Sequence, residues 1–106
     1  MKEDNDLIFK VLEWAKEKGI FEKGTIQSQT EKFLEEVKEL EEELTAYTKY
    51  SNERIMLEMG DVMVTLILLA EMHNFDIMEA LKAAYDKISK RKGKMLNGKF
   101  VKQEDL

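Results

Sequence analysis

The stretch NERIMLEMGDVMVTLILLAEMH, residues 52–73, decides the fold of this chain. Apolar residues recur in it every three or four positions, the period of an amphipathic helix: Ile55, Met59, Val62 and Leu66. From Val62 onward the stretch is apolar on almost every side. We therefore expect this helix at the centre of the protein, covered by its own chain and by a second subunit.

Composition favours further helices around this one. The 106 residues include no proline and only five glycines, so the chain lacks the turn residues that β-sandwiches and barrels need. One helix is expected from residue 4 or 5 to Gly19, followed by a short loop over residues 21–24. The next is expected from Thr25 or Ser28 to about residue 50, because Ser28 and Glu31 have capping-box spacing.

The C-terminal part of the sequence predicts one more helix and a small hairpin. Asp76 and Glu79 have capping-box spacing, which predicts the start of a helix. Apolar residues then recur at helical spacing as far as residue 88. Asn97-Gly98 between two short apolar pairs is typical of a two-residue β-turn. The expected fold is all-α, with four helices and a short C-terminal hairpin or irregular tail, in one domain over residues 1–106. From the residues alone, the helices suit either a bundle or a coiled coil.

Charge and composition exclude several classes of protein. The longest apolar run, residues 62–70, is far shorter than the roughly 20 residues of a membrane span, and the acidic N-terminus is unlike a signal peptide. Because cysteine is absent, disulfides and thiolate sites are excluded, and we expect a cytoplasmic protein. The net charge of −5 and the absence of any reading motif make nucleic acid an improbable partner.

Two pairs of acidic residues carry the strongest chemical signal. Glu36 and Glu39 lie three apart on one flank of the second long helix, and Glu58 and Asp61 repeat this spacing on the third. Side chains at i and i+3 project from one helical face, so four carboxylates can converge between two helices. Such a group needs protons or a cation, and oxygen-only ligands select magnesium or manganese.

Each of these features also has a purely structural interpretation. Residues 31–43 contain seven acids and two lysines, and taken alone this composition is typical of a solvated helix face. The pair Glu58 and Asp61 favours a functional interpretation, because it opens the most apolar helix. Gly60, between them, indicates either close approach of a ligand or helix packing against a small residue, with equal weight.

A basic segment follows the last helix. Residues 86–102 contain one acid and seven bases: Lys87, Lys90, Arg91, Lys92, Lys94, Lys99 and Lys102. Most of these suit a solvated helix end, where lysine is favourable near the C-terminal dipole. Lys87 and Arg91 share a face, four residues apart, and are the candidates for binding phosphate.

The order and spacing of these residues resemble the MazG-like nucleoside triphosphate pyrophosphohydrolases of the all-α NTP pyrophosphatase superfamily. The resemblance runs from about residue 7 to 91. It rests on the two acidic pairs together with Trp14-Ala15, Gly19-Ile20, Gly24-Thr25, Gln29, Lys32, Glu35, Leu40, Met59-Gly60, Val62, Lys87 and Arg91. The combination is specific, whereas either acidic pair alone is weak.

The resemblance implies an activity, a cofactor and an assembly. It implies Mg²⁺-dependent hydrolysis of a (deoxy)nucleoside triphosphate to the monophosphate and pyrophosphate, with Mn²⁺ as a possible substitute, in a homodimer or homotetramer whose chains complete one bundle. The implied metal ligands are Glu36, Glu39, Glu58 and Asp61, and Glu39 is also the candidate for accepting the proton of water. The implied substrate contacts are Lys32, Lys87, Arg91, Gln29 and Trp14.

The sequence is also compatible with a different class of function. The heptad-like spacing of the second long helix also suits a non-catalytic helical module that dimerises with itself or with a partner. A magnesium titration distinguishes the two, because only the enzyme is expected to respond to the metal.

Overall fold

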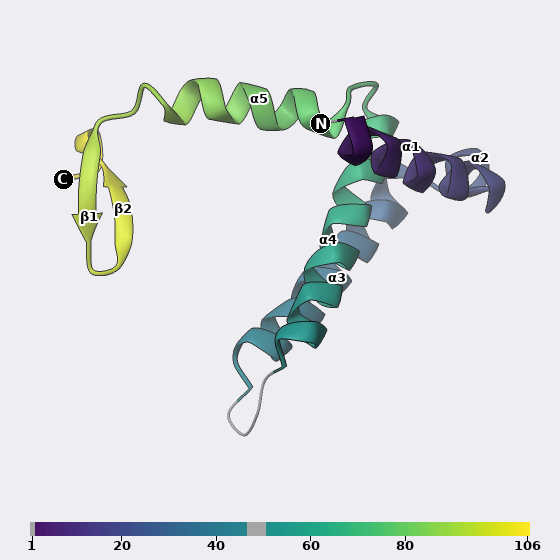
Figure 1. Cartoon of the computed structure of the whole chain (residues 1–106), viewed down its shortest axis with the longest axis horizontal. Coiled ribbons are helices and arrows are strands. Elements are labelled where there is room, and N and C mark those ends of the chain that lie inside the picture. The colour runs from purple at the N-terminus through teal and green to yellow at the C-terminus, as the bar shows by residue number, and fades with distance from the viewer. Residues whose placement is uncertain (1, 47–50) are drawn as a thin grey trace.

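The computed structural model describes residues 2–46 and 51–106, with side chains from residue 6 onward. The chain is all-α with a short C-terminal β-hairpin, as the sequence predicts (Figure 1). In chain order the elements are α1 Lys2–Glu17, α2 Ile20–Lys23, α3 Ile26–Leu44, α4 Asn52–Met72, α5 Ile77–Ile88, β1 Gly93–Leu96, β2 Lys99–Lys102 and the 3₁₀ turn η1 Gln103–Asp105.

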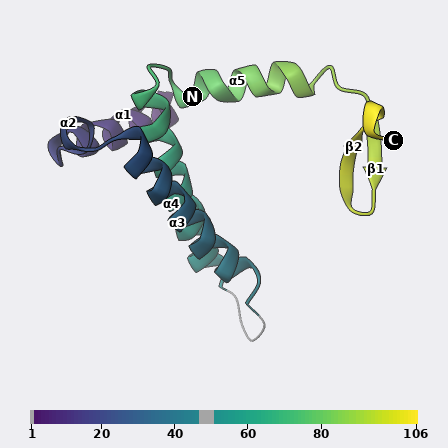
Figure 2. The ribbon, with the colours of Figure 1, turned by 180° about the vertical axis from the view of Figure 1, so that it is seen from behind.

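The body of the protein is the pair α3 and α4, which run side by side in opposite directions (Figures 1 and 2). α1 packs against α4, and its Ala15 is completely buried. The other buried apolar residues all lie in the second half of α4: Ile67, Leu68 and Ala70. The expectation that this helix is central is confirmed.

Several element boundaries follow the expected local signals. Gly19 adopts a left-handed conformation with φ 77°, which ends α1. Ser51 caps α4, and Asp76 with Glu79 forms the capping box of α5. The hairpin turns through Asn97 and Gly98, both at positive φ, as a type I′ turn requires.

Other boundaries differ from the expectation. α1 begins at Lys2, because acidic residues suit a helix N-terminus as well as a cap. The expected loop over residues 21–24 is the single helical turn α2. The capping box of α3 joins Thr25 to Ser28, with the Ser28 amide 3.0 Å from the Thr25 Oγ1, so the predicted pairing of Ser28 with Glu31 is wrong. α3 ends at Leu44, short of the expected end near residue 50, and residues 47–50 lie outside the described residues.

The elbow between α4 and α5 has a fixed hydrogen-bonding pattern. Asn74 is left-handed with φ 65°, its amide donates to the Glu71 carbonyl at 3.0 Å, and the Phe75 amide donates to the Ala70 carbonyl at 3.1 Å. This pattern is a Schellman motif, which satisfies the last carbonyls of α4. The capping box of α5 follows at once, so the direction in which α5 leaves is set by two adjacent motifs.

α5 leads away from the helix pair and carries the hairpin at its far end (Figures 1 and 2). The radius of gyration is 16.7 Å, whereas a compact chain of this length has about 13 Å. Many large apolar side chains are exposed as a result, including Met56, Leu81 and Tyr85 at 71%, 59% and 62%. A single chain therefore leaves much apolar surface in contact with water. Within residues 2–46 and 51–106, no helix combines the length and apolar character of a bilayer span.

Candidate active site

Three of the four predicted carboxylates meet between α3 and α4. Glu36 from α3 and Glu58 and Asp61 from α4 each place an oxygen within 4.8 Å of the others. The i and i+3 spacing on α4 aims Glu58 and Asp61 at the same side of the helix, toward the neighbouring α3. The pair on α4 and one member of the pair on α3 therefore converge.

Burial makes this cluster unusual. Glu36 is only 7% exposed, and its Oε1 lies 3.0 Å from the Lys32 Nζ. The Oε2 atoms of Glu36 and Glu58 are buried, and neither has a hydrogen-bond partner among the described residues. Leaving buried carboxylate oxygens without partners costs free energy, which a bound cation removes. The all-oxygen donor set and the two unpartnered oxygens fit a hard divalent cation such as Mg²⁺ or Mn²⁺.

Glu39 lies beside the cluster without belonging to it. The negative charge of Glu36 is the main cause that raises the pKa of Glu39 above its ordinary value, and desolvation and the charges of Glu58 and Glu35 act in the same direction. Glu39 is therefore an exposed carboxyl whose pKa is raised by the acids nearby. Glu39 is thus the one predicted metal ligand that the structure does not bring into the group of converging oxygens.

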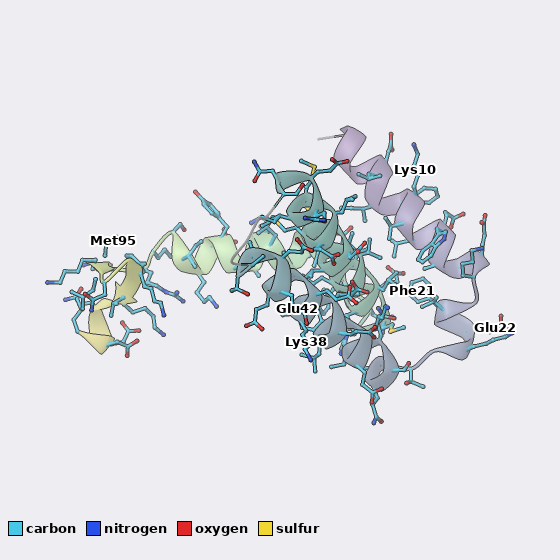
Figure 3. All side chains as sticks on the ribbon, turned by 90° about the horizontal axis from the view of Figure 1, so that it is seen from below. Lys10, Phe21, Glu22, Lys38, Glu42 and Met95 are labelled. Atoms are coloured by element: carbon cyan, nitrogen blue, oxygen red, sulfur yellow. The ribbon has the colours of Figure 1, made fainter. Side chains whose placement is uncertain are left out.

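Lys32 is the cation closest to the cluster. Its hydrogen bond to Glu36 and the charges of Glu35 and Glu36 raise the pKa of Lys32, so it stays protonated at neutral pH. On the opposite side of α3, Lys38 and Glu42 point away from α1 and from this site (Figure 3). The acidic surface of α3 therefore has two parts, one converging on α4 and one solvated.

A pocket of about 500 Å³ opens directly onto the carboxylates. Glu36 and Asp61 line it, and so do three residues predicted to bind substrate: Trp14, Gln29 and Lys32. The remaining lining residues, none of which the sequence predicts as a substrate contact, are Lys10, Val11, Ile20, Val64, Thr65 and Leu68. Helical spacing carried a signal for part of this set, because Val64, Thr65 and Leu68 follow Asp61 by three, four and seven residues.

Lys87 and Arg91 lie elsewhere. They line a second hollow of about 580 Å³ at the end of α5, together with Lys90, Lys92, Gln103 and Glu104. The two hollows share no lining residue, and α5 leads away from the helix pair (Figure 1). Within one chain, the structure thus brings Trp14, Gln29 and Lys32 to the acids and leaves Lys87 and Arg91 apart from them.

Gly60 lies between the two acids of α4 and faces open space. A Cβ atom added there would meet no described atom within 4 Å, apart from its two chain neighbours and the nearby backbone of its own helix. Packing against the described part of its own chain therefore does not explain a glycine inside this helix.

Comparison with known families agrees with the geometry. The family model of the MazG nucleotide pyrophosphohydrolase domain matches residues 24–96, more than half of the chain. The chain belongs to this family. The matched part of this MazG protein includes both acidic pairs together with Lys87 and Arg91, whereas α1, with Trp14, precedes it. Among curated proteins and solved structures, none matches the chain significantly.

Proposed function

We propose that this MazG protein hydrolyses a (deoxy)nucleoside triphosphate to the monophosphate and pyrophosphate in a Mg²⁺-dependent reaction. One observation carries the proposal: a pocket of about 500 Å³ is lined by Glu36 and Asp61 of a cluster in which two buried carboxylate oxygens have no described partner. A nucleotide and a divalent cation are the ligands that such a site suits best. In this proposal residues 1–106 form a single domain.

The metal would be held by Glu36, Glu58 and Asp61. The resemblance to the family adds Glu39 as the fourth carboxylate. Mg²⁺ fits the oxygen-only donors, and Mn²⁺ is the expected substitute. When bound, the cation supplies positive charge against the phosphate oxygens and makes water more acidic.

The protein's own side chains would orient the substrate and move one proton. Protonated Lys32 donates a hydrogen bond to a phosphate oxygen at the mouth of the acidic cluster. Glu39, an exposed carboxylate beside the cluster, accepts the proton of the attacking water. Trp14 offers an aromatic face to the nucleoside base, and the buried Gln29 offers an amide.

Lys87 and Arg91 would bind the phosphates as a pair. Lys87 is in the last turn of α5, and Arg91 lies three residues beyond the end of this helix at Ile88. Two cations four residues apart match a triphosphate, which carries several negative charges, and the Arg guanidinium contacts two oxygens at once. This role requires them to reach an acidic pocket, although they lie apart from it within one chain.

We also propose that the protein is a homodimer or homotetramer. Apolar residues are exposed along α4, notably Met56, Met59 and Met63 at 71%, 47% and 59%. An exposed apolar face of this extent is typical of an interface. A second copy packed there would complete the bundle and account for Gly60, whose open side lies among these methionines.

A product assay over a panel of ribo- and deoxynucleoside triphosphates tests the proposed activity. We expect pyrophosphate rather than orthophosphate, release that requires Mg²⁺, and loss of turnover in Asp61→Asn. The matched control is Glu42→Gln, which removes the same charge from the outer side of α3 (Figure 3). Orthophosphate as the product, or equal activity in Asp61→Asn and the control, would refute the proposal.

The exposed apolar faces also support a second candidate function, a non-catalytic helical interaction module. That function predicts that magnesium leaves the melting temperature unchanged and that Asp61→Asn keeps full partner binding. A magnesium titration followed by thermal unfolding separates the two candidates.

A further inference from the structure

Lys32 places a positive charge directly at the acidic cluster. Its Nζ lies 3.0 Å from the Oε1 of Glu36, the buried member of the cluster, and 3.7 Å from the Oε1 of Glu35. Among the described residues, no other lysine or arginine forms an ion pair with Glu36, Glu58 or Asp61. In the metal-free protein, Lys32 is therefore the counter-ion of the cluster within the described part of the chain.

Lys32 and a divalent cation would compete for the same carboxylate. Glu36 is only 7% exposed, so water screens its charge poorly and its interactions with cations are strong. A cation held by the cluster would lie close to the Lys32 ammonium, because both would contact Glu36. Two positive charges repel at such a separation. Lys32 therefore opposes binding of the metal, and a bound metal weakens the attraction between Glu36 and Lys32.

The Lys32 side chain is able to leave Glu36. It is 52% exposed, and four rotatable carbons connect its ammonium to the backbone of α3. It also lines the pocket of about 500 Å³, together with Trp14 and Gln29. A change of side-chain rotamer is therefore enough to move the ammonium from Glu36 to a phosphate bound in the same pocket.

We propose that Lys32 is an exchangeable counter-ion, which neutralises Glu36 in the metal-free protein and passes to a phosphate oxygen of the substrate when the metal binds. Its charge then disfavours the metal alone and favours the metal together with a triphosphate. The two ligands bind with positive cooperativity, since the metal releases Lys32 and the phosphate accepts it. The transfer to phosphate rests on the proposed function, whereas the competition at Glu36 does not.

Helix α3 offers a matched control for this lysine. Lys38 lies on the same helix, points away from α1 and from the acidic cluster, and forms no ion pair among the described residues (Figure 3). Lys32→Gln and Lys38→Gln remove the same charge from α3, but only the first removes it from Glu36. Glutamine and lysine have similar helix propensities, so both variants are expected to keep the fold.

Two calorimetric titrations test the proposal by the sign of their effects. In the first, Mn²⁺ is added without nucleotide, and we expect Lys32→Gln to bind it roughly tenfold more tightly than wild type. One unit charge beside the site has an effect of this order even in a water-like dielectric. In the second, a triphosphate analogue with an imido bridge between the α- and β-phosphorus is added at saturating Mn²⁺. Here we expect Lys32→Gln to bind roughly tenfold more weakly. Lys38→Gln should match wild type in both.

Each other combination of results has a distinct meaning. Weaker binding of both ligands by Lys32→Gln would show that Lys32 only orients Glu36, and would overturn the exchange. Unchanged binding of Mn²⁺ would show that Lys32 does not compete with the metal, and would overturn it as well. Tighter binding of Mn²⁺ in a protein whose wild type binds no analogue would overturn the proposed function and the transfer to phosphate, and leave the competition at Glu36 standing.

A spectroscopic measurement follows Lys32 in the wild type itself. The side-chain ammonium groups of ¹⁵N-labelled protein give NMR signals, and the Lys32 signal is assigned by its absence from Lys32→Arg. We expect this signal to shift when diamagnetic Mg²⁺ is added and to shift again when the analogue follows, whereas the Lys38 signal stays in place. A Lys32 signal that does not respond to Mg²⁺ would contradict the exchange.

Discussion

Replacing Glu58 with glutamine is expected to stabilise the metal-free protein. Glu58, Glu36 and Asp61 hold oxygens within 4.8 Å of one another, and the Oε2 of Glu58 is buried without a described partner. Glutamine keeps the shape of the side chain and removes one of the mutually repelling charges. Its amide also donates to a neighbouring carboxylate oxygen that has no partner.

The size of the effect follows from the separation of the charges. Two unit charges 4.8 Å apart repel by about 0.9 kcal/mol in water and by about 3.5 kcal/mol at an effective dielectric constant of 20. The Lys32 ammonium, 3.0 Å from Glu36, offsets part of this repulsion. We therefore expect a gain of about 1–2 kcal/mol, which raises the melting temperature by roughly 5–15 °C in a domain of this size.

Thermal unfolding with a chelator and then with Mg²⁺ provides the assay, at one fixed protein concentration. Wild type is expected to gain about 2.7 kcal/mol when the metal is at a hundredfold excess over its Kd. Glu58→Gln should gain far less, because it has lost a ligand. Glu42→Gln, on the outer side of α3, should behave as wild type in both conditions (Figure 3). A lower melting temperature for metal-free Glu58→Gln, or an undiminished response to Mg²⁺, would refute the reasoning.

Three further predictions concern other parts of the protein. Glu39→Gln should raise the metal-free melting temperature near neutral pH and leave it unchanged well below pH 4.5, the ordinary pKa of a glutamate side chain. The pKa of Glu39 is raised in the folded state, so the folded state binds more protons than the unfolded state. The stability of the wild type therefore falls as the pH rises above 4.5. Melts across this pH range check it, and an equal difference at all pH values would contradict it. Thr25→Ala should destabilise the protein by about 1 kcal/mol through loss of the α3 cap, measured by denaturant unfolding, whereas no change would show that the cap is dispensable. Trp14 is the only tryptophan and lines the pocket, so nucleotide binding should change its fluorescence. Trp14→Ala should raise KM more than it lowers kcat. Tryptophan fluorescence that stays unchanged at saturating nucleotide would place the base elsewhere.

The sequence predicts the acidic pair of α4 better than it predicts the buried core. Glu58 and Asp61 share a side because the 3.6-residue period fixes positions within one helix. The predicted apolar stripe of this helix is only partly buried, because Met59 and Leu66 are 47% and 37% exposed, and Ile67, Leu68 and Ala70 are buried instead. Glu36 joins the acidic pair because α3 packs beside α4.

The features that the sequence does not predict depend on competing local choices or on three-dimensional placement. Thr25 and Ser28 both have cap chemistry, and Ser28 pairs backward with Thr25 instead of forward with Glu31. The direction of α5 depends on a left-handed Asn74, a conformation that asparagine permits without requiring it. The separation of Lys87 from the acids follows from that elbow, and spacing along the chain carries no signal of it.

Some residues that line the pocket lie in the part of the sequence that the family model matches, and others lie before it in the sequence. Glu36, Asp61, Gln29 and Lys32 lie within residues 24–96, whereas Val11 and Trp14 come from α1. The cluster that would hold metal therefore belongs to the matched region. The aromatic wall that would contact the nucleoside is contributed by the helix outside it.

The central claim is that Glu36, Glu58 and Asp61 form a site for a divalent cation. Calorimetric titration with Mn²⁺ tests this most directly, using wild type, Asp61→Asn and the charge-matched Glu42→Gln. We predict a saturable binding isotherm for wild type and Glu42→Gln, and loss of that isotherm in Asp61→Asn. Equal binding by Asp61→Asn and wild type, or no saturable binding by wild type, would contradict the account.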